Sequence, residues 1–189
     1  MISKKISDAL NGQVAKEANA MNSYLAMASW CEKQGLRGCS AFLYEQSEEE
    51  KEHMMKLFRY INEAGGHAVA PQIKQPAIKY KSITDVFTQA LEHEKEVTKS
   101  INKLVELCFS TKDHASYNFL QWYVTEQVEE ENLFGTILDI IKLAGGESNK
   151  NLLIIDREIN GMKYKDIAEK YGIKKRSIAT RIRRARNKI

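Results

Sequence analysis

Glutamate and histidine side chains recur at helical spacing in the segment EQSEEEKEHMMKLF. Glu50 and His53 lie three residues apart, so an α-helix would place both on one face. Carboxylate and imidazole ligands together suit iron, with manganese or zinc as competitors. One such pair also arises by chance on a solvated helix face. The pair therefore indicates a metal site only if other segments supply further ligands.

Three other segments do so. Glu17 and Glu94 each share a helical face with apolar residues, and Gln127 and Glu130 lie three apart, just before Phe134. Burying several carboxylates is costly unless a cation compensates their charge. One Glu from each of two helices, with Glu-x-x-His-type pairs from two others, is a di-metal carboxylate arrangement. The pattern predicts a buried metal centre between four helices.

The elements that must carry these residues are four long helices. Apolar residues recur every three or four positions, and glycines end the apolar stripes. The predicted helices span residues 5–33, 39–64, 83–110 and 114–144. Residues 67–82 hold both prolines and show no helical period, and they exceed the roughly 2–8 residues usual between neighbouring helices. A connection of that length lets the second and third helices run parallel, with one long crossover.

Residues 1–146 resemble the non-haem bacterial ferritins. The matching stretches are LNGQVAKEANAMNSYLAMASWCE, EQSEEEKEHMMKLFRYINEAGG and LQWYVTEQVEEENLFGTIL. Bacterioferritins and rubrerythrins carry a second Glu-x-x-His in the fourth helix, where this chain has Gln127 and Glu130. The resemblance therefore implies an all-α, ferritin-like four-helix bundle of the ferritin type, with no haem.

The resemblance also implies roles for individual residues. The ligands of the first iron would be Glu17, Glu50 and His53. Glu50 would bridge to a second iron, also held by Glu94 and Glu130 with Gln127 beside it. A third iron site would use Glu49, Glu126 and Glu129. Tyr24 would hydrogen-bond near the centre and supply an electron, so Tyr24, Glu50 and His53 are the expected catalytic residues.

The activity implied by the resemblance is that of a ferroxidase. Two Fe(II) ions per subunit would be oxidised by O2 or H2O2, and the Fe(III) product would be stored as mineral. Ferritins do this inside a homo-oligomeric shell, for which the resemblance implies 24 subunits.

The cysteines and the N-terminus predict a cytoplasmic location. Cys31, Cys39 and Cys108 form no CxxC pair, which argues against a disulfide framework and suits a reducing compartment. The start MISKKISDAL has no apolar signal region, and no run of 18 apolar residues occurs. We therefore expect no membrane partner.

Some residues have plainer interpretations. His67, His93 and His114 are expected at the surface rather than among the ligands. Trp122 is expected in the core or at an interface, with a redox role as the alternative because the family has a tryptophan there.

The last part of the chain has a different charge. Residues 151–189 carry a net charge of +8, whereas residues 1–150 carry −4, so two parts with different partners are expected. The predicted domains are a di-iron bundle over 1–146 and a basic extension over 147–189. Helical segments are predicted at 151–159, 163–171 and 174–188, with turns at Asn160-Gly161 and Gly172.

The segment NGMKYKDIAEKYGIKKRSIATRIRRARNKI resembles a helix-turn-helix of sigma factors and response regulators. The resemblance implies DNA contacts through Lys174, Lys175, Arg176, Arg181, Arg183 and Arg184. The alternatives are a solvated basic tail, or a tail held against acidic walls or mineral inside the shell. Residues 151–159 fit either a ferritin fifth helix or the first helix of a DNA-binding unit. The alternative function is a DNA-associated regulator that responds to iron or oxidant.

Overall fold

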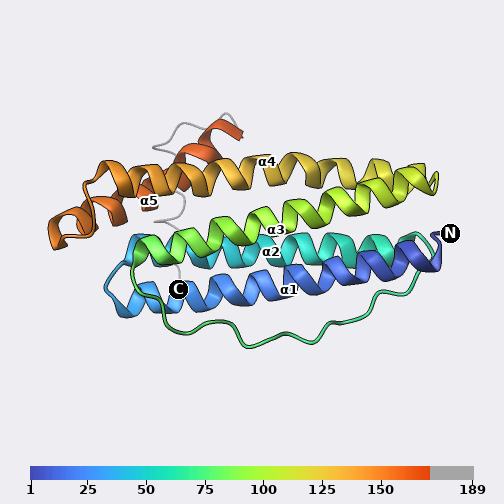
Figure 1. The fold of residues 1–189 in the computed structure, drawn as a ribbon, viewed down its shortest axis with the longest axis horizontal. Coiled ribbons are helices and arrows are strands. Elements are labelled where there is room, and N and C mark those ends of the chain that lie inside the picture. The colour runs from blue at the N-terminus through green and yellow to red at the C-terminus, as the bar shows by residue number, and fades with distance from the viewer. Residues whose placement is uncertain (171–189) are drawn as a thin grey trace, which may run out of the picture.

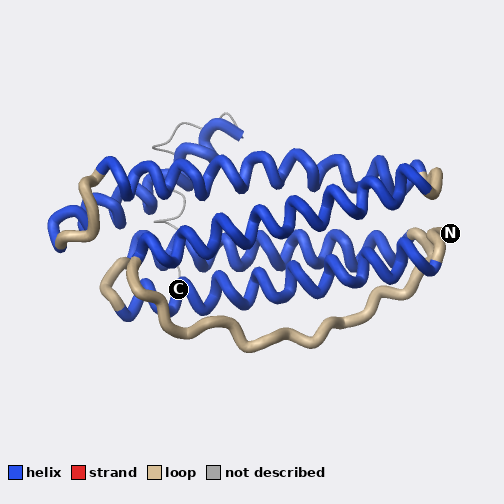
Figure 2. The backbone as a smooth tube through the Cα atoms, in the orientation of Figure 1, coloured by secondary structure: helices blue, strands red, loops and turns tan. Residues whose placement is uncertain are grey.

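Five α-helices make up the part of the chain that the computed structural model describes, the backbone of residues 1–170 and the side chains of residues 1–162 (Figures 1 and 2). The helices are α1 (Lys4–Lys33), α2 (Arg37–Glu63), α3 (Ile83–Ser110), α4 (His114–Leu143) and α5 (Asn149–Lys170). No strand occurs in this described part, and none of its helices is long and apolar enough to cross a membrane. The predicted all-α class and the first four helices are confirmed.

Side-chain caps and left-handed glycines fix the helix ends. Ser82 accepts a hydrogen bond from the Asp85 amide at 3.1 Å, and Asp113 accepts one from the Ser116 amide at 3.0 Å. Such caps satisfy amides that have no partner within the helix. At the other end of a helix, Gly35 follows α1 with a φ of 82°, a conformation that glycine adopts without a steric penalty.

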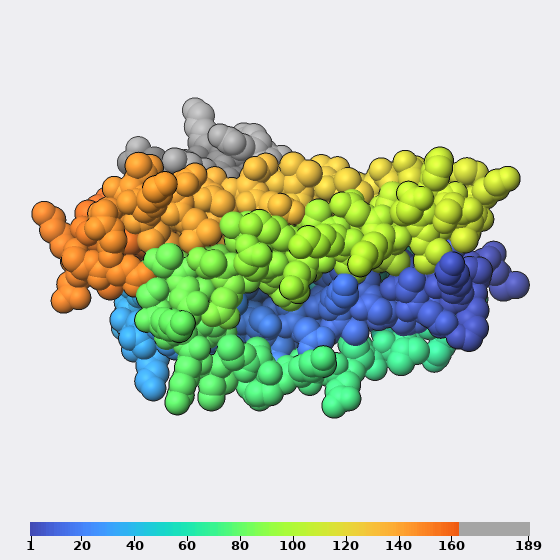
Figure 3. Space-filling view, in the orientation of Figure 1, coloured from blue at the N-terminus to red at the C-terminus, as the bar shows by residue number. Residues whose placement is uncertain are grey.

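The crossover between α2 and α3 runs the length of the bundle (Figure 1). The α1–α2 and α3–α4 pairs are hairpins, and the crossover returns the chain so that α2 and α3 run in the same direction, as predicted. It lies along α1 (Figure 3), where Asn11 accepts from the Val69 amide and Asn19 accepts from the Lys74 amide, both at 2.8 Å. These bonds satisfy backbone groups of a segment without regular structure.

The apolar core of the bundle is divided into two clusters. One contains Leu10, Leu57, Ile101 and Leu120, and the other contains Phe87 together with aromatic and aliphatic residues from the opposite half of the helices. Between them lies a layer of polar side chains that are at most 6% exposed: Glu17, Glu50, His53, Glu94, Gln127 and Glu130. The predicted ligands therefore interrupt the apolar core at one level along the bundle.

Helix α5 packs against the start of α2. Ile155 and Ile159 are fully buried in the same apolar cluster as residues of α1 and α2. The Cys39 amide donates to Asp156 Oδ1 at 2.8 Å, which fixes this contact.

The predicted turn at Asn160-Gly161 is wrong, because α5 continues through both residues to Lys170. Gly161 does not adopt the positive φ that Gly35 and Gly145 show at helix ends. A glycine inside a helix costs about 1 kcal/mol relative to alanine, a penalty that the surrounding helix can absorb.

The contact between α2 and α5 predicts a specific sensitivity at Gly38. A β-carbon there would lie 2.1 Å from the carbonyl oxygen of Asp156, so Gly38→Ala must displace α5. We expect a loss of about 1–3 kcal/mol in thermal unfolding, with faster limited proteolysis within α5. The matched control is Gly12→Ala, where a β-carbon meets nothing within 4 Å. That variant should gain about 0.5–1 kcal/mol; equal behaviour of the two variants would contradict the packing described here.

Candidate metal centre

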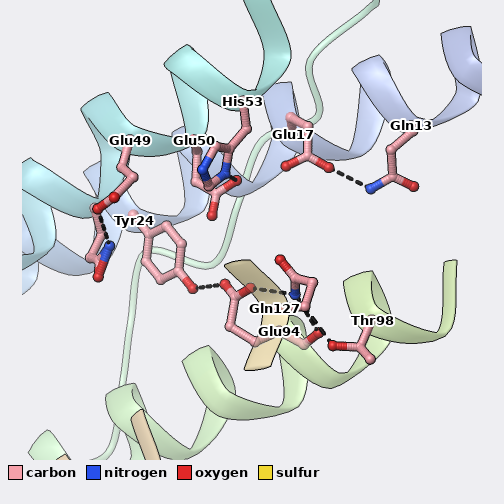
Figure 4. A network of polar contacts seen from close by, with 10 residues as sticks. Gln13, Glu17, Tyr24, Glu49, Glu50, His53, Glu94, Thr98 and Gln127 are labelled. Atoms are coloured by element: carbon pink, nitrogen blue, oxygen red, sulfur yellow. Dashed lines mark hydrogen bonds and ion pairs between the residues drawn. The ribbon is translucent and has the colours of Figure 1, made fainter. Parts of the chain in front are cut away.

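All four long helices contribute to the polar layer (Figure 4). Glu17 comes from α1, Glu50 and His53 from α2, Glu94 from α3, and Gln127 and Glu130 from α4. The i,i+3 spacing turns two side chains of α2 toward the same interior point, as the sequence predicted. Residues from distant parts of the chain thus meet in one buried layer.

Glu17, Glu50 and His53 form the tightest group of possible ligands. One ligand atom from each lies within 4.8 Å of the others. Glu17 Oε2, Glu50 Oε2 and His53 Nδ1 are buried and have no hydrogen-bond partner, although His53 Nδ1 lies 3.6 Å from Glu50 Oε2. Buried polar atoms are normally satisfied. Glu17, Glu50 and His53 therefore fit a cation with oxygen and nitrogen ligands, because they gather in one buried cluster and each has an unsatisfied polar atom.

Glu94 differs from Glu17 and Glu50 in that both of its carboxylate oxygens accept hydrogen bonds. The Tyr24 hydroxyl donates to Oε1, and Gln127 Nε2 donates to Oε2 at 3.2 Å. The same Gln127 nitrogen also lies 3.2 Å from the Glu94 carbonyl and 3.3 Å from Thr98 Oγ1. A cation bound by Glu94 and Glu130 must therefore share or replace these contacts.

The electrostatics of the layer disfavour its negative charge. Burial raises the pKa of Glu50 well above its usual range, and repulsion from Glu17 and Glu94 adds to this effect. Burial likewise raises the pKa of Glu94 to about 7, although hydrogen bonds from Tyr24 and Gln127 oppose that rise. Burial and the charge of Glu94 hold the pKa of Tyr24 above its usual range, so its hydroxyl stays protonated. A bound cation would favour the ionised carboxylates.

Beside this centre, the ligand atoms of Glu49, His53 and Glu126 lie within 4.8 Å of one another. Both carboxylates are half-buried, and Gln46 donates to Glu49 Oε2 at 3.0 Å. Glu129 is exposed and does not belong to this group, so its role in a third site stays a prediction.

Aromatic rings enclose the His53 side of the centre. The rings of Trp122 and Tyr123 are stacked at 4.4 Å, and each lies 5.4 Å from the His53 ring. Trp122 is half-buried and Tyr123 is fully buried, which fits the predicted core position of Trp122. Lys56 Nζ lies 3.5 Å from the centroid of the Trp122 ring, a cation–π contact.

Two features of the site were missed or misplaced by sequence reasoning. Gln13 is buried and hydrogen-bonded to Glu17, and its position one helical turn before Glu17 was the available signal. His93 was expected at the surface but is half-buried, with Nε2 inaccessible and its ring against Tyr24 at 6.3 Å. His67 and His114 are exposed, as predicted.

Carboxylates from every helix of a four-helix bundle, with one imidazole and a long crossover, are the arrangement found in the class of ferritin-like carboxylate bundles that bind metal ions. The comparisons with known proteins identify the family within that class. The family model for the ferritin-like domain matches residues 7–144. The chain therefore belongs to the ferritin family.

The relatives cover most of the chain. It is 46% identical over 162 residues to a bacterial non-heme ferritin of Campylobacter jejuni, covering 86% of this chain and 96% of that protein. It is 44% identical to a probable bacterial non-heme ferritin-like protein of Haemophilus influenzae, covering 87% and 99%. A crystal structure of an open pore ferritin from Archaeoglobus fulgidus superposes with a TM-score of 0.82 at 41% identity, covering 85% and 98%.

A second family model, region 4 of sigma-70, matches residues 154–189. This supports the predicted resemblance of the C-terminal extension. The match begins inside α5, whose Ile155 and Ile159 are buried against the bundle. The predicted DNA-contacting residues and the predicted turn at Gly172 lie outside the residues that the structure describes.

The raised pKa of Glu94 predicts how the stability of the metal-free protein depends on pH. Its pKa is about 7 in the folded state, against an ordinary value of 4.5, so the folded state binds more protons in this interval. Stability should therefore fall as the pH rises from about 5 to about 8. The variant Glu94→Gln has no titrating group at this position. Its loss of stability over this pH range should be smaller than that of the unmodified protein by about 1–3 kcal/mol. Thermal unfolding in the presence of a chelator measures both; equal pH slopes for the two proteins would contradict this origin.

Proposed function

We propose that this protein is an iron-storing ferritin with ferroxidase activity. It oxidises Fe(II) at the buried carboxylate centre with O2 or H2O2 and keeps the Fe(III) product as mineral in a homo-oligomeric shell. The observation that carries the proposal is the buried cluster of Glu17, Glu50 and His53, whose ligand atoms lie within 4.8 Å of one another and each of which has a polar atom without a hydrogen-bond partner. Membership of the ferritin family supports the same conclusion.

The proposed chemistry follows from the charge of the ligands. Glu17, Glu50 and His53 bind one Fe(II), and Glu50 faces a second Fe(II) bound by Glu94 and Glu130 with Gln127 beside it. Anionic oxygen ligands in a buried site stabilise the higher charge of Fe(III) over that of Fe(II). Two Fe(II) ions supply the two electrons that reduce O2 to H2O2, with two protons taken up. Where H2O2 is the oxidant, two Fe(II) ions supply the two electrons that, with two protons, convert one H2O2 into two water molecules.

Two groups next to the centre have proposed supporting roles. The Tyr24 hydroxyl stays protonated and donates a hydrogen bond to Glu94. The ring therefore lies beside the centre, where it is placed to supply an electron. Glu49 and Glu126 lie close to His53 and offer a third iron position, which Glu129 extends toward the exposed surface.

Exposed apolar side chains support the proposed shell. Leu25 of α1 is 45% exposed, and Ile73 and Ile78 of the crossover are 44% and 67% exposed. Large apolar residues at the surface often mark contacts between subunits. We propose a shell of 24 subunits, as the ferritin resemblance implies, and a cytoplasmic location.

The ferroxidase proposal is tested with the double variant Glu50→Ala/His53→Ala. It removes two proposed ligands, so the initial rate of Fe(II) oxidation in stopped-flow absorbance should fall by more than about 100-fold, since losing a supporting partner of a ligand already costs about 10- to 100-fold. The control Glu48→Ala/Glu52→Ala removes two exposed carboxylates of the same helix and should keep the rate. An unchanged rate in the first variant would refute the proposed centre.

The second candidate function is DNA binding by the C-terminal extension, alone or together with iron storage. It is favoured by the match of residues 154–189 to sigma-70 region 4 and by the charge of +8 over residues 151–189. The proposed contacts are Lys174, Lys175, Arg176, Arg181, Arg183 and Arg184. The protein would then be a DNA-associated regulator, in which the extension binds DNA and the bundle responds to iron or oxidant.

A gel-shift titration with duplex DNA tests this second candidate. The full chain should bind at low salt, and its affinity should fall by about 10³-fold or more between 50 and 200 mM salt if six or more phosphates are contacted. A chain that ends at Lys170 keeps α5 and lacks residues 171–189, so it should not bind. DNA binding is ruled out if the full chain fails to bind even at low salt.

A further inference from the structure

A chain of hydrogen bonds leads from the surface to the predicted ligand Glu17. The residues that form it are not themselves predicted ligands. Lys16 Nζ donates to Ser100 Oγ at 2.6 Å, and Ser100 Oγ donates to Gln13 Oε1 at 2.6 Å. Gln13 Nε2 then donates to Glu17 Oε1 (Figure 4). Lys16 is exposed, whereas Gln13 is 1% exposed and Glu17 is fully buried. The chain therefore connects solvent with one carboxylate of the centre, through both α1 and α3.

The donor at each step is fixed by chemistry. A lysine ammonium group can only donate, so the Ser100 hydroxyl accepts from it, and Ser100 donates its own single proton to Gln13 Oε1. Gln13 must then present its carbonyl oxygen to Ser100, which leaves its amide nitrogen facing Glu17. Since both neighbours constrain the amide, its orientation cannot reverse without the loss of a hydrogen bond.

This chain distinguishes the two oxygens of Glu17. Oε1 accepts the amide of Gln13, whereas Oε2 is buried without a hydrogen-bond partner, and Glu17 is one of the three residues whose ligand atoms gather with those of Glu50 and His53. Glu94 shows the opposite arrangement, because hydrogen bonds occupy both of its oxygens. Glu17 thus has one oxygen without a protein donor, whereas a cation at Glu94 must share or replace the bonds from Tyr24 and Gln127.

We propose that Gln13, oriented by Ser100 and Lys16, is a positioning residue that holds Glu17 with one oxygen free to bind a divalent cation. The inference rests on the proposed function, since it concerns the same centre. Partners that orient a metal ligand act through its geometry, and their loss typically weakens metal affinity by about 10- to 100-fold. Gln13 also lies next to the apolar cluster that contains Leu10 and Val14, where a residue with only a packing role would be apolar.

The test is anaerobic titration of the full-length, metal-free protein with Co²⁺, followed by visible absorption and calorimetry. Gln13→Met keeps the length of the side chain and removes the donor. We expect the first Co²⁺ bound per chain to lose about 10- to 100-fold in affinity, with altered ligand-field bands. The control Gln89→Met makes the same exchange at an exposed glutamine of α3 that donates to Asp85, and it should bind Co²⁺ as the unmodified protein does.

A second pair of variants keeps the test valid if Gln13→Met fails to fold. Ser100→Ala breaks the chain one step further out and should weaken the first Co²⁺ to a smaller extent, whereas Ser100→Thr keeps the hydroxyl and should restore the affinity. Unchanged affinity and spectrum in Gln13→Met, or in Ser100→Ala, would overturn the inference. Failure of the unmodified protein to bind Co²⁺ would instead overturn the proposed function, so the two failures are distinguishable.

Discussion

The cost of burying several carboxylates in one layer of the bundle is the constraint on which the rest of this structure depends. Glu17, Glu50, Glu94 and Glu130 are each at most 5% exposed. Removing an ion from water costs on the order of several kcal/mol even after relaxation. The raised pKa values of Glu50 and Glu94 express this cost. The fold tolerates the layer, and a cation is the partner that would compensate it.

The surrounding structure stabilises this layer in two ways. Apolar clusters lie on both sides of it, so burial of hydrophobic surface offsets the cost of the charges. Hydrogen bonds then hold particular oxygens: Gln13 holds one on Glu17, and Tyr24 and Gln127 hold both on Glu94. Glu17 and Glu94 are chemically alike, but they differ in how many of their oxygens accept hydrogen bonds from the protein. The asymmetry of the candidate site is thus set by the neighbouring side chains.

Sequence reasoning succeeded where local rules decide the outcome. Helical periodicity, caps and glycines gave the first four helices, and the i,i+3 spacing of Glu50 and His53 placed both on one face of α2, which the structure buries. It failed where a weak local signal competed with the rest of the helix. The pair Asn160-Gly161 reads as a turn, yet α5 continues through it beyond the anchoring contacts of Ile155 and Ile159. The division of the chain into domains at residues 1–146 and 147–189 remains a prediction.

By itself, the sequence determined the first four helices and the residue types of the candidate metal centre, because periodicity and spacing act over a few turns. The length of the crossover determined that the second and third helices run parallel. The tertiary structure decided which atoms of those residues are free. Gln13, which holds one oxygen of Glu17, accepts a hydrogen bond from Ser100 of another helix, and both oxygens of Glu94 accept bonds from Tyr24 and Gln127 of two other helices. Hydrogen bonds between distant segments form only after the helices pack, so no local pattern specifies them.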